Sequence, residues 1–83
     1  MKKAITRVQT GIRIERRLLK VLKGLAEYLG MSLGDLLEGV VLHSFENLPP
    51  FSPETLQKIQ QLKEVYDCDL VAADSHQLTE ERE

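Results

Sequence analysis

The hydrophobic and polar positions change period near residue 15. Before it, apolar or small side chains at Val8, Thr10, Ile12 and Ile14 alternate with polar ones, which is the period of a half-buried β-strand. From Arg16 onward the apolar residues recur every three or four positions, as in an amphipathic helix. The pattern predicts a strand followed by helices, and no other stretch is a convincing strand.

Three helices are predicted after the strand. The first ends at Gly30, since glycine readily takes the left-handed conformation that closes a helix. The second starts after the N-cap candidate Ser32 and ends before Pro49 and Pro50. The third starts at Ser52-Pro53 and reaches about residue 66. We therefore divide the chain into a basic arm (1–6), a strand-helix-helix domain (7–48) and an extension (49–83) that holds the third helix, near 53–66, and an acidic tail.

The predicted strand has no partner within its own chain. Buried backbone groups without hydrogen bonds are costly, so the simplest partner is the same strand of a second copy, antiparallel across a two-fold axis. We expect a mainly α homodimer with a two-stranded ribbon and a core shared by both chains. The expected dimer-core residues are Val8, Ile12, Ile14, Leu22, Leu37 and Val41.

Charge is divided unevenly along the 83 residues. Residues 1–25 hold eight Lys or Arg and one Glu, a net charge of +7, whereas residues 26–83 hold three Lys or Arg and twelve acidic residues, a net charge of −9. This asymmetry indicates a polyanion partner at the N-terminal end, with a solvated basic helix face as the alternative.

Other functional classes have little support in the sequence. His43, Cys68 and His76 lack the spacing of metal ligands, and the acidic neighbours of Cys68 would not activate its thiol, so we expect no metal, no cofactor and no enzymatic activity. No apolar run has membrane-spanning length and no signal peptide is evident, so we expect a soluble cytoplasmic protein without membrane contact.

The polar face of the predicted ribbon suits double-stranded DNA. A two-stranded ribbon fits the major groove, where arginine can bond to guanine and glutamine to adenine. The expected base contacts are Arg7, Gln9 and Arg13, with Gly11 contributing backbone only. The expected phosphate contacts are the start of the second helix and the arm, at Ser32, Leu33, Gly34, Lys2 and Lys3.

The strand, the first helix, the turn Gly30-Met31-Ser32 and a second helix ending at Ser44-Phe45 resemble the ribbon-helix-helix (Arc/MetJ-type) family of DNA-binding repressors. Over residues 7–46 the similarity is greatest to the Arc type. The resemblance implies a dimeric transcriptional repressor with ribbon readout and a phosphate clamp at Ser32. Gly11 departs from the family pattern, because it offers no side chain at one of the three reading positions.

Two interpretations of the third helix stay open. It packs on its own dimer, which its clear start signals favour, or it binds a protein partner as the corresponding segments of antitoxins do. In the second case the protein is an interaction module that uses the dimer only to assemble. The partner-binding residues would then be Leu56, Ile59, Leu62 and Tyr66.

Overall fold

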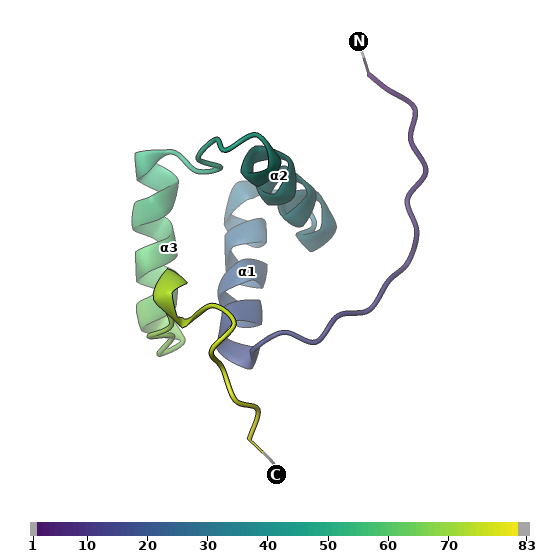
Figure 1. The fold of residues 1–83 in the computed structure, drawn as a ribbon. Helices are drawn as coiled ribbons and strands as arrows, with labels where there is room; N and C mark the ends of the chain where they lie inside the picture. The colour runs from purple at the N-terminus through teal and green to yellow at the C-terminus, as the bar shows by residue number, and fades with distance from the viewer. Residues whose placement is uncertain (1, 82–83) are drawn as a thin grey trace.

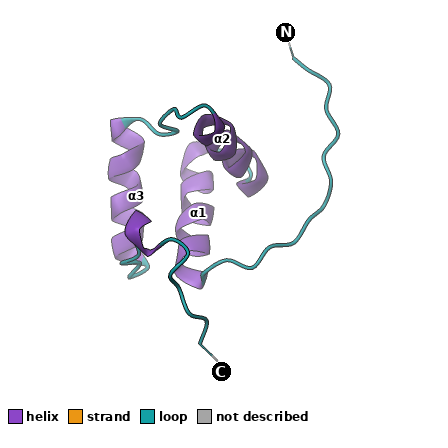
Figure 2. Ribbon diagram, in the orientation of Figure 1, coloured by secondary structure: helices purple, strands orange, loops and turns teal. Residues whose placement is uncertain are grey.

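The computed structural model describes residues 2–81 and consists of three α-helices with an extended segment before them (Figures 1 and 2). Helix α1 spans Arg16–Leu29, α2 spans Leu33–Phe45 and α3 spans Pro53–Val65, and a short 3-10 helix, η1, follows at Ala72–Asp74. Helix α1 lies between the other two and contacts both. Met1 and residues 82–83, the ends of the predicted arm and acidic tail, lie outside the described residues.

The predicted strand, and with it the ribbon-helix-helix fold, is wrong. Residues 2–15 form an extended segment that curves away from the helices, and no strand occurs anywhere in residues 2–81 (Figures 1 and 2). The alternation at residues 8–14 describes which side chains share a face, but a strand also needs a neighbour that exchanges backbone hydrogen bonds. No described segment of the chain supplies that neighbour, so the backbone stays extended and unpaired.

The ends of α1 are fixed by local hydrogen bonds. The Glu15 carboxylate accepts hydrogen bonds from the backbone N–H groups of Arg17 (2.8 Å) and Leu18 (3.0 Å), which otherwise lack acceptors in the first turn. At the other end Gly30 has φ of 70°, and its N–H donates to the carbonyls of the last turn. The glycine is needed there because a Cβ is strained in this left-handed conformation.

Serine caps start the other two helices. The Ser32 hydroxyl accepts a hydrogen bond from the Asp35 N–H, and the Ser52 hydroxyl accepts one from the Thr55 N–H. Pro53 occupies the first turn of α3, where its missing N–H costs nothing. These caps lie where the sequence predicted them.

The core lies where α1 meets both of its neighbours. Leu25, Ala26 and Leu36 are buried, and Leu25 is only 1% exposed. Partly buried apolar residues from all three helices and the α2–α3 loop pack around them: Leu22, Leu29, Val40, Phe51, Ile59 and Leu62. Helix α3 is therefore a structural element of this body within the single chain.

A close approach joins α1 to α3. A Cβ added at Gly24 would lie 3.0 Å from Leu62 Cδ2, tighter than ordinary van der Waals contact. Glycine in the middle of a helix is intrinsically unfavourable, so this contact gives it a packing role. Gly24 lets the Leu62 side chain reach the surface of α1.

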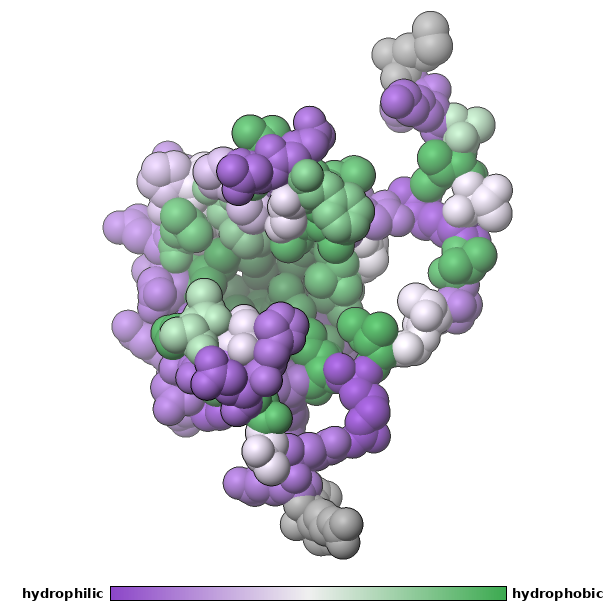
Figure 3. Space-filling model, viewed as in Figure 1, coloured by the Kyte–Doolittle hydropathy of each residue, from purple (hydrophilic) through white to green (hydrophobic). Residues whose placement is uncertain are grey.

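Much apolar surface remains uncovered. Val8 on the N-terminal segment and Phe45 on α2 are each 81% exposed, and Ile12, Val41 and Leu42 are exposed as well. Figure 3 shows apolar residues at the centre of one face, between α2 and α3. The chain exposes 7619 Å², whereas a compact monomer of its mass exposes roughly 5,000 Å². The chain is thus less compact than its size requires, and the extended, exposed residues 2–15 account for part of the excess surface.

Candidate nucleic-acid interface

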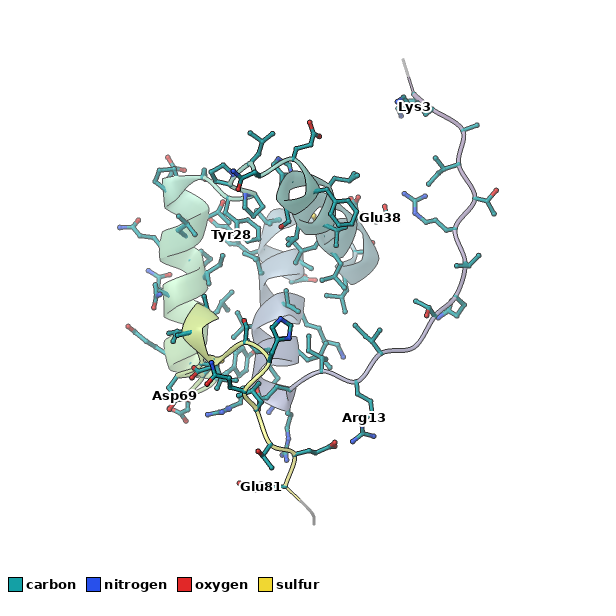
Figure 4. The ribbon with its side chains drawn as sticks, viewed as in Figure 1. Lys3, Arg13, Tyr28, Glu38, Asp69 and Glu81 are labelled. Atoms are coloured by element: carbon teal, nitrogen blue, oxygen red, sulfur yellow. The ribbon has the colours of Figure 1, made fainter. Side chains whose placement is uncertain are left out.

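The N-terminal segment carries the predicted base-contact residues on an exposed, extended backbone. It leaves the helical body at the start of α1 and its backbone runs past α2, with Lys3 and Arg13 near its two ends (Figure 4). Arg7, Gln9, Gly11 and Arg13 are all exposed, and no atom lies within 4 Å of the position where a Gly11 Cβ would stand. A planar or charged ligand can therefore approach this backbone closely at Gly11.

Arg7 is bound to α2 by two hydrogen bonds. Its Nε and Nη2 atoms each donate to one carboxylate oxygen of Glu38, both at 2.9 Å. This parallel geometry is the one in which a guanidinium also binds a phosphate or the edge of guanine. The hydrogen bonds raise the pKa of Arg7 and lower that of Glu38, so both groups are charged at neutral pH.

Arg13 pairs with the C-terminal segment. Its Nη2 donates to the Glu80 carboxylate, and the side chains remain 82% and 72% exposed respectively. The C-terminal segment thus returns to the base of the N-terminal segment, where α1 begins (Figures 1 and 4). An acidic residue of the C-terminal segment and a basic residue of the N-terminal segment therefore meet at the start of α1.

Arg17 is held at the same end of the molecule. It donates to Glu15, to the Asp67 carbonyl at 3.0 Å and to the Asp69 carboxylate at 3.2 Å. The hydrogen bond to Glu15 contributes most to raising the pKa of Arg17. Partial burial opposes ionisation of Glu15, but hydrogen bonds from Leu18 and Arg17 outweigh it and leave the pKa of Glu15 below its ordinary value.

The predicted phosphate contacts lie in two places. Lys2 and Lys3 are exposed near the free end of the N-terminal segment, whereas Ser32, Leu33 and Gly34 start α2. The Ser32 hydroxyl accepts a hydrogen bond from the Asp35 N–H, so the N–H groups of Leu33 and Gly34 are the ones that point out of the helix end. The Asp35 carboxylate lies in the same turn and already complements the helix dipole, so it competes with an incoming anion there.

The predicted dimer-core residues divide into exposed and packed groups. Val8, Ile12 and Val41 are exposed, and Ile14 is 38% exposed. Leu37 is half-buried, and Leu22 packs against the intrachain core. The predicted set is therefore split between the surface and the core of the single chain.

The predicted partner-binding residues of α3 are turned mainly inward. Ile59 and Leu62 pack on the core, and the Tyr66 ring lies under Lys20, whose Nζ is 5.9 Å from the ring centroid. Leu56 is the exception, at 51% exposed. A partner would find little of this apolar set on the surface.

Sequence reasoning missed Glu38 and Glu80, which contact the predicted reading arginines. Arg7 and Glu38 are 31 positions apart, and Arg13 and Glu80 are 67 apart. No local spacing rule connects residues at such separations. Glu15 was also missed as a cap, because glutamate is not among the residues preferred at the N-cap position.

Residues considered for metal binding lie apart. The His43 ring and the Gly39 carbonyl form a hydrogen bond of 2.7 Å within α2, and Cys68 is buried beyond α3. Among residues 2–81 no group of three His, Cys, Asp or Glu is arranged to hold a metal ion. No helix in this range is long and apolar enough to cross a bilayer.

The chain was compared with protein families, curated proteins and solved structures. No family model, no curated protein and no solved structure matches this chain.

Proposed function

We propose that the protein binds double-stranded DNA and represses transcription, with the N-terminal segment (residues 2–15) as its main contact surface. The observation that carries this proposal is an exposed, extended backbone with arginines at positions 7 and 13, a glutamine between them and two lysines near its free end. The proposed site of action is the cytoplasm, a reducing compartment that suits a chain with one unpaired cysteine.

Extended basic arms are a known means of entering DNA grooves. Arginine-bearing arms of helical DNA-binding domains reach into one groove while a helix of the same domain occupies the adjacent major groove. Fourteen fully extended residues span roughly 46–50 Å, which exceeds one helical turn of DNA at about 34 Å. The segment is therefore long enough to place arginines and lysines on successive phosphates and base edges of one site.

Association of two copies is part of the proposal. The exposed apolar residues of α2 and of the N-terminal segment, with an accessible surface well above that of a compact monomer, favour a partner of the same kind. A dimer would present two basic segments to two half-sites. Sedimentation equilibrium at micromolar concentration should give twice the chain mass of 9.5 kDa. A folded species of single-chain mass would refute this part alone.

A salt titration with random-sequence duplex DNA tests binding. Affinity should fall steeply with salt, since each phosphate contact releases counterions and adds about 0.9 to the slope of log K against log salt. Replacing Lys2 and Lys3 by Ala should lower that slope by about 2. Lys58→Gln, which removes the same kind of charge from α3, is the control and should leave the slope unchanged.

Sequence readout requires a second measurement. Selection from a random duplex pool should yield a preferred site, and on that site Arg13→Ala should weaken binding roughly tenfold or more. Absence of binding to any duplex at low salt would refute the proposed function. If Lys58→Gln weakened DNA binding as much as Arg13→Ala does, the N-terminal segment would not be the main contact surface.

A further inference from the structure

Both arginines predicted to contact bases are already paired with acidic residues of the same chain. Glu38 of α2 holds Arg7, and Glu80 of the C-terminal segment holds Arg13. The two carboxylates come from different elements, yet each lies on an arginine of the N-terminal segment. This matches the overall charge division, in which the basic end of the sequence meets the acidic remainder.

These ion pairs do not hold the fold together. The Arg7 and Arg13 side chains stay 66% and 82% exposed, and exposed ion pairs contribute little to stability because water screens them. They nevertheless occupy the guanidinium donors, since the two parallel bonds from Arg7 to Glu38 use the edge that would bind a phosphate or guanine. The ion pairs should therefore affect the affinity for nucleic acid and not the stability of the fold.

We propose that Glu38 and Glu80 are intramolecular competitors of DNA: they occupy Arg7 and Arg13 in the free protein and are displaced when the duplex binds. The proposal rests on the proposed DNA binding. Duplex DNA carries one charge about every 1.7 Å, so it displaces a single carboxylate that a weaker polyanion does not. The paired state thus lowers affinity for all nucleic acids and penalises ligands of low charge density most.

Charge-neutralising variants measure this competition. Glu38→Gln and Glu80→Gln should each tighten binding to a duplex about two- to fivefold at low salt, and the gain should shrink as salt screens the pairs. Glu54→Gln changes net charge equally and should have a much smaller effect, because Glu54 lies in the first turn of α3, on the opposite side of the helical body from the N-terminal segment (Figure 1). Thermal melting of Glu38→Gln and Glu80→Gln should match the unmodified protein, whereas Glu54→Gln should melt slightly lower, because it loses a charge that complements the dipole of α3.

A double-mutant cycle separates pairing from general electrostatics. In an Arg7→Gln background, Glu38→Gln should no longer improve affinity beyond the Glu54→Gln control, because its partner is gone. Equal gains with and without Arg7, or equal gains for Glu38→Gln and Glu54→Gln, would overturn the inference while leaving DNA binding intact. Absence of binding by the unmodified protein and by every variant would overturn both proposals. Binding that appears only in Glu38→Gln or Glu80→Gln would support the competition by these carboxylates and refute the proposed function of the unmodified protein.

Discussion

Replacing Leu62 by alanine measures how far α3 belongs to the core of this protein. Leu62 is half-buried, packs against the cluster of Leu25, Ala26 and Leu36, and makes the close approach to Gly24. Truncating a fully buried leucine costs 2–5 kcal/mol, so the low end of that range, about 2 kcal/mol, is the value for a partly buried one. Such a loss changes the unfolding equilibrium roughly thirtyfold.

Urea unfolding followed by circular dichroism is the assay. A domain of this size has a denaturant slope of about 1–2 kcal/mol per molar, so the midpoint should fall by about 1–2 M. Leu56→Ala on the same helix makes the same chemical change at a half-exposed position, and its midpoint should shift by less than about 0.5 M. Both proteins must be compared at one concentration, since association alters apparent stability. Equal midpoints for the two variants would refute the packing of α3 on α1.

Three further predictions concern helix caps and helix glycines. Glu15→Ala should lower stability by about 1 kcal/mol, measured by thermal melting, because the first turn of α1 loses its cap. Because the pKa of Glu15 is lowered, its contribution to the free energy of unfolding is complete above the ordinary pKa of 4.5 and is lost as pH falls below it. Glu15→Ala should therefore lose less stability in acid than the unmodified protein, measured by urea midpoints from pH 7 to 3. Gly30→Ala should lower the free energy of unfolding by about 1 kcal/mol, because Gly30 has a left-handed backbone. Gly39→Ala, in open space within α2, should raise the melting temperature. A higher melting temperature for Gly30→Ala than for Gly39→Ala would contradict the assignment of Gly30 as the cap.

The helices were predictable because their signals are local. Gly30 ends α1, Ser32 starts α2, and Ser52-Pro53 starts α3 in the structure as the sequence indicates. Each signal acts through a hydrogen bond or backbone preference within four residues of the helix end. Such interactions can be inferred without knowing the fold.

The strand was not predictable in the same way. Alternation at residues 8–14 is compatible with any extended backbone, and the hydrogen bonds that define a strand depend on a neighbour distant in sequence or in another molecule. The ion pairs of Arg7 and Arg13 also depend on residues distant in sequence, since Glu38 and Glu80 become their neighbours only after the helices have packed. Long-range contacts of this kind follow from tertiary structure alone.

Labelling of the Cys68 thiol can measure local opening of the turn after α3. Its side chain is buried just beyond α3, and its backbone N–H donates to the Lys63 carbonyl at 2.8 Å, which ties the turn to the last part of that helix. A thiol reagent can reach the sulfur only when this end opens, so the labelling rate measures the free energy of that opening separately from global unfolding. Because the sequence holds one cysteine, the signal comes from this turn alone.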